Sequence, residues 1–166
     1  VRSDLIIAAT PELARRFPSH RTVVIDQDEG ADGSWITRAA TVGRIAHERF
    51  VDAEIGNLLE RLQPLEESLE YDSDDASLIR VTRRDWEKQR RVPTELRTEM
   101  IRSAALGNQV WIEARATNDF PKFLPALQRN LDLKRRYVEC FEWDDSPYTP
   151  LLDDFEPFMK TSEVAD

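Results

Sequence analysis

The sequence predicts an all-α protein, an antiparallel multi-helix bundle of about five main helices joined by short loops, and it allows a short strand near the N-terminus. From residue 34 onward, apolar residues recur almost without interruption at steps of three and four, the spacing of one helix face. Good helix-capping residues stand at the breaks between these stripes. The 166-residue chain has 5 glycines, which disfavours barrels, sandwiches and phosphate-cradling loops.

The first two helices are expected on either side of Asp52. Ser34 is a suitable N-cap for the first, which runs at helical spacing to Phe50. Asp52 is the expected cap of the second, and Pro64 should kink or end it. The predicted buried stripe of the second helix is Ile55, Leu58, Leu59, Leu62 and Leu65.

The third and fourth helices are expected to flank Pro93, which is well placed in a first helical turn. Residues 71–75 form a polar connector, and Asp74 or Asp75 can cap the third helix, which runs toward Arg91. Its stripe is Leu78, Ile79, Thr82 and Trp86. The stripe of the fourth helix is Leu96, Met100, Ala104, Gly107, Trp111 and Ala114, whose small members would let a neighbouring helix approach closely.

The fifth helix is expected after a cap at Asn118-Asp119, with Pro125 in its first turn or bending it. Its predicted inward positions are Phe120, Phe123, Leu124, Leu127, Leu131, Tyr137, Val138 and Phe141. Residues 142–159 read as an ordered but irregular segment. Residues 161–166 have the composition of a helix start, so we expect this sequence to be a piece of a longer protein.

Residues 1–33 lack this helical pattern. A short helix is expected at 5–16, a strand at Arg21–Ile25 because of its β-branched residues, and an acidic loop at 26–33. The predicted domain organisation is therefore an N-terminal segment, 1–33, and a helical domain, 34–166.

Composition excludes several function classes. A net charge of −9 opposes binding to nucleic acid or to an anionic membrane. Cys140 is the single cysteine, which cannot form an internal disulfide and fits a reducing cytoplasm. No apolar stretch approaches the roughly 18 residues of a membrane span.

A zinc site is not predicted in this chain. A catalytic zinc needs about three convergent ligands, whereas the chain has 2 histidines, His20 and His47, with no histidine partner at i+4. His47-Glu48 begins like a His-Glu-x-x-His motif, but Val51 stands where the second histidine would be. We therefore expect His47 to be a packing or helix-surface residue, and we predict no catalytic, metal-ligating or cofactor-binding residue.

Other clusters favour structural interpretations. The acidic run 72–75 lacks the glycine and glutamate of a calcium loop, because Ser77 and Arg83 occupy those positions. Cys140, near the end of an apolar stripe, is expected to be a small buried hydrophobe. The basic run 80–91 around Trp86 contains Asp85 and Glu87, which favours a solvated helix face with local ion pairs over a nucleic-acid surface.

Four segments, taken in order, are similar to the N-terminal helical region of the carboxypeptidase Taq family. They are AHERFVDAEIG at 46–56, RRDWEKQRRVP at 83–93, WIEARATNDF at 111–120 and LLDDFEPFMKTSEV at 151–164. The resemblance covers about residues 34–166. It implies a cytoplasmic, broadly specific, homodimeric and nearly all-helical zinc carboxypeptidase.

The resemblance also implies where the chemistry lies. In this family a His-Glu-x-x-His helix and a later glutamate hold the zinc, and the motif's glutamate acts as general base on the metal-bound water. These residues follow the Asp-Asp-aromatic-Glu-Pro string, which here is 153–157. No family ligand or catalytic residue therefore maps onto this sequence, and we expect the chain to be inactive alone.

Two departures from the family pattern stand out. A Trp-Asp-Gln stretch followed by Met-Pro-x-Gly-Gly is only echoed by Ile25-Asp26-Gln27, and Phe158 stands where the family tends to have glycine after Glu-Pro. They leave two interpretations open: a divergent, inactive member, or an N-terminus that belongs to another kind of protein.

The predicted function is that of a non-catalytic N-terminal part of a zinc-dependent carboxypeptidase, which shapes the groove that admits peptide C-termini. The implied partners are a C-terminal catalytic half, peptide substrate and a second copy of the protein, and the surface that packs on the catalytic half should be apolar and exposed. The alternative is a stand-alone helical protein-interaction module without enzymatic activity.

Overall fold

Helices dominate the computed structural model, which describes residues 5–8, 21–24 and 34–164. The five long helices are α2 (Ser34–Phe50), α3 (Ala53–Ser68), α4 (Asp74–Gln89), α5 (Thr94–Ala116) and α6 (Phe120–Val138). Two one-turn helices follow, α7 (Thr149–Leu152) and α8 (Thr161–Val164). The predicted all-α class, with about five main helices, is confirmed.

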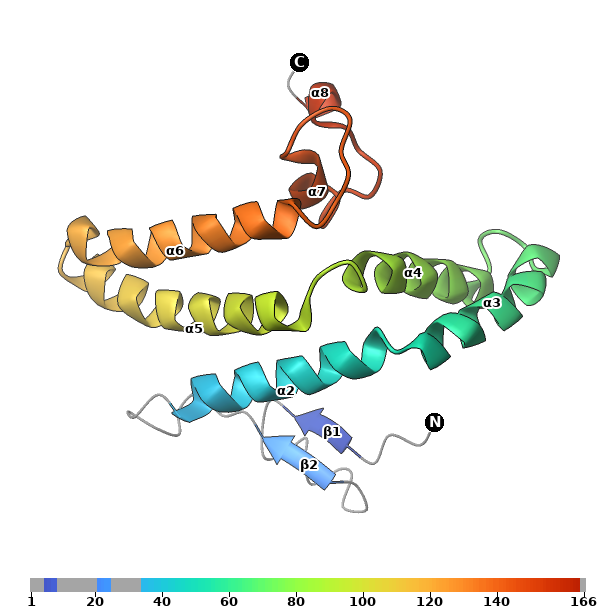
Figure 1. The fold of residues 1–166 in the computed structure, drawn as a ribbon, viewed down its shortest axis with the longest axis horizontal. Helices are drawn as coiled ribbons and strands as arrows, with labels where there is room; N and C mark the ends of the chain where they lie inside the picture. Colours follow the sequence, from blue (N-terminus) through green and yellow to red (C-terminus); the bar gives the residue numbers. More distant parts are fainter. Residues whose placement is uncertain (1–4, 9–20, 25–33, 165–166) are drawn as a thin grey trace.

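The long helices form three antiparallel passes (Figure 1). Helices α2 and α3 make the first pass, and α4 and α5 return beside them, so that α4 packs on α3 and α5 packs on α2. Helix α6 then turns back along α5. The chain from α7 to α8 lies at the C-terminal end of α6.

Three helix starts are fixed by side chains that accept a backbone hydrogen bond. Asp52 accepts from the Glu54 N–H at 2.8 Å, and Asp119 accepts from the Lys122 N–H at 3.2 Å, as the sequence predicts. The cap of α4 is Ser73, not Asp74 or Asp75. These two carboxylates instead occupy the first turn, where negative charge is favoured by the helix dipole.

The prolines differ in how they relate to the helix boundaries. Helix α3 continues to Ser68 beyond Pro64, so the proline does not end it. Pro64 is exposed on the helix, and the carbonyl that loses its partner can therefore be hydrated. Pro125 lies inside α6 beyond its first turn, and Pro93 is the N-cap of α5.

The core lies where α5 and α6 meet the linker after α4. Its buried members are Val92, Leu96, Leu133 and Tyr137, with Met100, Cys140, Phe141 and Leu151 packed against them. A second close contact joins α3 to α4, where Gly56 meets the Trp86 ring. This arrangement places the end of α4 against the segment that follows α6.

Several residues predicted to be buried are exposed. They are Leu58, Leu62, Leu65, Leu78, Ala104, Trp111, Phe120, Leu124 and Leu131. In α3 only Gly56 and Leu59 of the apolar positions are fully buried. Helix α3 packs mainly against one other helix, α4. A single neighbouring helix covers only part of the predicted apolar stripe.

The N-terminal strands pair in parallel. Strand β1 (Leu5–Ala8) aligns with β2 (Arg21–Val24), with Leu5 opposite Arg21 and Ala8 opposite Val24. Strand β2 falls within the range where the sequence predicts a strand. The helix predicted at 5–16 is wrong at 5–8, where the β-branched pair Ile6-Ile7 joins the ladder; residues 9–16 and the loop predicted at 26–33 lie outside the described residues.

Two residues other than glycine have positive φ, among the residues described. Asn118, between α5 and α6, has a φ of 53°, and Phe158 has a φ of 70°. Asparagine tolerates this left-handed region, whereas a bulky residue is strained there by about 1–2 kcal/mol. Phe158 stands where the resemblance leads us to expect glycine, so the departure is a site of local backbone strain.

This strain gives a test by substitution. Phe158→Gly is expected to be more stable than Phe158→Ala by about 1 kcal/mol, because both remove the ring near Arg84 but only glycine removes the strain at positive φ. Urea unfolding of the two variants, followed by circular dichroism, measures the difference. Equal stabilities, or a more stable alanine variant, would contradict the strain at residue 158.

Candidate functional site

A cluster of charged side chains joins α4 to the segment after α6. It consists of Arg84 and Lys88 of α4, Tyr137 of α6, and Asp153 and Asp154; we call it the Asp153 junction. Arg84 and Lys88 are four residues apart, so they share one face of α4. The two aspartates directly follow α7, which ends at Leu152. Three separate parts of the chain thus meet at this point.

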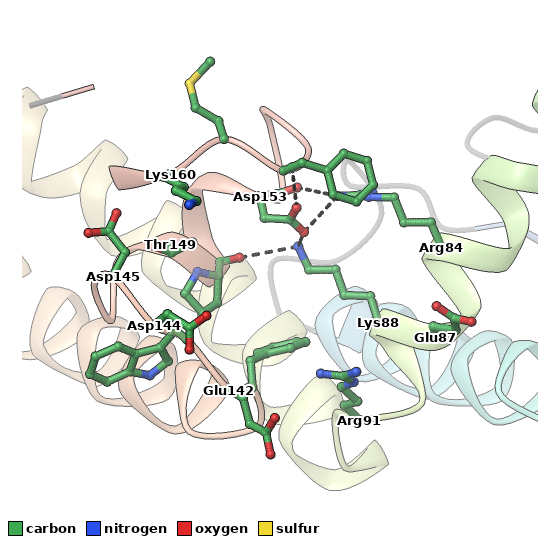
Figure 2. Close-up of a pocket in the computed structure, with 15 residues that line it drawn as sticks. Arg84, Glu87, Lys88, Arg91, Glu142, Asp144, Asp145, Thr149, Asp153 and Lys160 are labelled. Carbon is green, nitrogen blue, oxygen red and sulfur yellow. Dashed lines mark hydrogen bonds and ion pairs between the residues drawn. The ribbon is translucent and has the colours of Figure 1, made fainter. Parts of the chain in front are cut away.

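Asp153 is the centre of this junction (Figure 2). Its Oδ2 lies 2.6 Å from Lys88 Nζ and 2.8 Å from Arg84 Nη2, and its Oδ1 accepts from the Phe158 N–H at 2.9 Å. Arg84 also donates to the Asp153 carbonyl oxygen at 2.6 Å. Asp153 therefore fixes both the direction of α4 and the turn at Phe158.

Asp154 extends the cluster to α6. Its Oδ1 lies 2.6 Å from Lys88 Nζ and accepts from the Tyr137 hydroxyl at 2.8 Å. Burial, followed by the hydrogen bond to Asp154, raises the pKa of Tyr137 well above its ordinary range. Tyr137 therefore stays protonated and acts as a hydrogen-bond donor at this site.

The charge state of Asp153 follows from its surroundings. Burial by itself would raise the pKa of Asp153, but hydrogen bonds from Lys88 and from the Phe158 N–H, with the positive charges nearby, outweigh it and hold the pKa below its usual value. Asp153 is therefore ionised at neutral pH and available to both cations.

The lowered pKa predicts a pH dependence of stability. In the unfolded chain Asp153 has a pKa of about 3.9, so the native state binds fewer protons and its stability decreases as the pH falls. The difference in unfolding free energy between the wild type and Asp153→Asn should be fully present above about pH 4 and shrink below it. Urea unfolding at pH 6 and at steps down to pH 3 measures this; a difference that grows on acidification would contradict the assignment.

An open cleft lies beside the junction (Figure 2). It has a volume of about 430 Å³, and we call it the junction cleft. Its lining includes the aromatic rings of Phe141, Trp143 and Phe158. Its charged lining residues are Arg84, Glu87, Lys88, Arg91, Glu142, Asp144, Asp145, Asp153 and Lys160. The cleft therefore combines aromatic surface with side chains of both charges.

His47 is buried, as a packing histidine would be. The residue is 4% exposed, and its Nε2 donates to the Val92 carbonyl oxygen at 3.0 Å, because a carbonyl oxygen can only accept. The hydrogen bond ties α2 to the linker before α5. His20 lies outside the described residues.

The other residues singled out in the sequence have structural partners. Cys140 is half-buried at the edge of the core, and its burial raises the pKa of its thiol. In the basic run, Arg83 contacts Glu66 of α3 at 3.4 Å, while Arg84 and Lys88 contact the Asp153 junction. The basic run forms ion pairs, as predicted, but these three residues pair with distant segments of the chain instead of with neighbours on one helix face.

The arrangement does not fit a zinc site. Among the residues that the structure describes, no three His, Cys, Asp or Glu side chains converge on a point where they could hold a metal ion. His47 Nε2 is engaged by Val92, and Asp153 and Asp154 are engaged by cations. We therefore derive no chemical step through a metal in this chain.

No helix in the described part is long and apolar enough to cross a membrane.

Sequence reasoning missed the Asp153 junction. In a chain with 32 acidic residues, an adjacent pair such as Asp153-Asp154 does not by itself indicate a partner. The sequence feature that could have indicated this junction is the i,i+4 pair Arg84 and Lys88, because two cations on one helix face favour an acidic partner. That partner is 65 or more residues away along the chain, so only the tertiary structure reveals it.

Comparisons with known proteins agree with this fold. The family profile of the carboxypeptidase Taq (M32) metallopeptidases matches residues 27–166. Thermostable carboxypeptidase 1 of Pyrococcus furiosus is 32% identical over 120 residues, covering 72% of this chain and 23% of that protein. Its namesake in Thermus thermophilus is 31% identical over 134 residues, covering 75% and 26%.

A solved structure of Pyrococcus furiosus carboxypeptidase shares the arrangement of the helices. The TM-score is 0.64 at 27% identity, and the match covers 84% of this chain and 28% of that one. The chain spans about a quarter of the length of the curated relatives that it matches. On the extent of the profile match, the chain belongs to the carboxypeptidase Taq (M32) family of metallopeptidases.

Proposed function

We propose that this chain is the N-terminal, non-catalytic helical part of a zinc-dependent carboxypeptidase that trims C-terminal amino acids from peptides. Its role is to form one wall of the groove that admits the peptide. The observation that supports this most directly is the junction cleft, which combines aromatic rings with charges of both signs on a fixed scaffold. The family match supports the peptidase class.

The Asp153 junction gives this wall its shape. Ion pairs of 2.6–2.8 Å hold the segment after α6 against α4, so Trp143 and Phe158 keep their places at the cleft. Side chains held in one geometry lose less conformational entropy when a ligand binds. The wall therefore presents a preformed surface to a peptide without taking part in bond cleavage.

The proposal includes the partners and setting that the family implies. Residues 34–166 act as a unit beside a catalytic half that supplies the zinc, in a cytoplasmic homodimer. The exposed leucines of α3, Leu58, Leu62 and Leu65, support a further packing partner. These same leucines also favour the alternative, a stand-alone helical interaction module.

Kinetics on the proposed full-length enzyme test the wall. Trp143→Ala is expected to raise KM for a peptide with a free C-terminus several-fold while kcat stays within twofold, because Trp143 contacts substrate but not the reacting atoms. Trp111→Ala is the matched control: it removes an exposed tryptophan of α5 outside the junction cleft and should leave KM unchanged. A Trp143 variant with unaltered KM would contradict the groove role.

A second experiment separates the peptidase part from the interaction module. The chain alone should release no C-terminal amino acid from a peptide and bind no stoichiometric zinc by mass spectrometry. The proposed full-length protein should do both. Trimming by the chain alone would show a missed catalytic site, and a full-length protein without peptidase activity would favour the interaction module.

A further inference from the structure

The segment that follows α6 carries charge of only one sign. Between Arg136 and Lys160 the sequence contains no lysine or arginine. The acidic residues in this interval are Glu139, Glu142, Asp144, Asp145, Asp153, Asp154 and Glu156. Asp153 and Asp154 pair with cations of α4, whereas the other acidic residues make no ion pair within the described residues. The segment therefore brings negative charge without a cationic partner to the junction cleft.

The charges that remain available in the junction cleft are mainly negative. Arg84 and Lys88 are engaged by Asp153. Four carboxylates and two cations make up the other charged lining residues, and none of them forms an ion pair in the described part of the chain: Glu87, Glu142, Asp144, Asp145, Arg91 and Lys160. Of the four carboxylates, that of Asp145 already accepts from the Ser162 N–H at 2.8 Å. The balance favours a ligand group with positive charge.

One of the three aromatic rings in the cleft is open to such a group. Lys88 Nζ lies 5.8 Å from the ring centroid of Phe141, and Arg84 Cζ lies 5.6 Å from that of Phe158. Trp143 is 45% exposed, and no cation of the described residues lies over its ring. Tryptophan is the ring that attracts a cation most strongly. The indole of Trp143 can therefore receive a cation from outside the chain.

We propose that the junction cleft binds an arginine side chain of a peptide, with its guanidinium over the Trp143 indole and its N–H groups toward Glu142 and Asp144 (Figure 2). A guanidinium stacks on an aromatic face and donates charge-assisted hydrogen bonds from its edge, so one group uses both features. A lysine ammonium is a compact and more strongly hydrated charge, which fits them less well. The proposal names a substrate class, arginine-containing peptides, and it rests on the proposed function of the groove wall.

Matched peptides test the arginine. Isothermal titration of the 166-residue chain with the acetylated and amidated peptide Gly-Ser-Arg-Ser-Gly should show saturable binding in the millimolar range. Citrulline has nearly the shape of arginine without its charge, so the citrulline peptide should bind at least tenfold more weakly. The lysine peptide should bind several-fold more weakly, and added salt should weaken binding of the arginine peptide. No binding of the arginine peptide, or equal binding of either analogue, would overturn the proposal.

Paired variants then assign the binding to this cleft. Glu142→Gln combined with Asp144→Asn should weaken binding of the arginine peptide at least fivefold without changing Tm, because both residues are exposed. Glu60→Gln combined with Asp72→Asn is the matched control. It removes the same charge from exposed residues outside the cleft and should bind like the wild type. An equal loss in the two double variants would show a response to overall charge and overturn the site.

A single variant tests the ring, and the blocked peptide separates this proposal from peptide trimming. Trp143→Leu keeps apolar bulk but removes the indole, so it should weaken binding of the arginine peptide several-fold; unchanged binding would overturn the stacking. The probe has no free C-terminus, so its binding does not depend on peptidase activity. A chain that does not bind it, from a full-length protein that trims peptides, would overturn the arginine site alone. Binding without peptidase activity would support the arginine contact and reject the peptidase function.

Discussion

Lys88→Met is expected to lower the free energy of unfolding by about 3 kcal/mol and to release the segment after α6 from α4. Lys88 Nζ lies 2.6 Å from both Asp153 and Asp154, and its side chain is 14% exposed. Methionine retains the apolar stem but leaves Asp153 with Arg84 as its only ion-pair partner and Asp154 with only the hydrogen bond from Tyr137. Removing one member of a poorly solvated ion cluster costs more than the net value of the cluster, because the remaining charges lose their partners.

The measurement combines thermal unfolding with limited proteolysis. The Lys88→Met variant should melt at a lower temperature and be cleaved faster within residues 142–160. Arg91→Met is the control, since Arg91 lines the same cleft but is exposed and makes no ion pair within the described residues. Adding Asp153→Asn and Asp154→Asn to Lys88→Met should recover part of the loss; a further loss of similar size would contradict the explanation by unpaired charge.

Gly56→Ala is expected to destabilise the contact between α3 and α4 by about 2 kcal/mol. A Cβ at residue 56 would lie 2.5 Å from Cζ2 and 2.6 Å from Cη2 of Trp86, well inside van der Waals contact. The Trp86 ring is held by its Nε1, which donates to the Asp52 carbonyl oxygen at 3.3 Å, so it cannot move freely away. The helix propensity gained by alanine, about 1 kcal/mol, offsets only part of this strain.

Asn57→Ala separates propensity from packing. Asn57 is exposed on the same helix, so its replacement by alanine should leave stability unchanged or raise it slightly. Urea unfolding followed by tryptophan fluorescence reports on both variants. If Gly56→Ala were as stable as Asn57→Ala, the close approach of Trp86 to α3 would not constrain residue 56.

The exposed leucines of α3 show a limit of pattern analysis. The periodicity of Leu58, Leu62 and Leu65 identifies a helix, but it reports an apolar stripe and not what covers that stripe. In this chain α4 covers Gly56 and Leu59, while the three leucines lie outside that contact. Burial depends on the number and position of neighbours, which the local sequence does not contain.

The candidate sites show the same limit more strongly. Sequence patterns predicted that His47 is a packing or helix-surface residue, but not that it is hydrogen-bonded to Val92, 45 residues away. Asp153 lies in a string that resembles the family, but the string does not indicate its ion pairs with Arg84 and Lys88, which form only after folding. Charge pairs that close over such distances have no periodicity that a sequence window can detect.

By itself, the sequence determined the five long helices, two of their acidic caps and the family, because helical periodicity, capping and short ordered motifs are local properties. Only the tertiary structure decided which apolar residues stay exposed, that Asp153 links α4 to the chain after α6, and that His47 is hydrogen-bonded to Val92. These features arise from contacts between segments far apart in the chain, so their energies are set by the packing of whole helices and not by neighbouring residues.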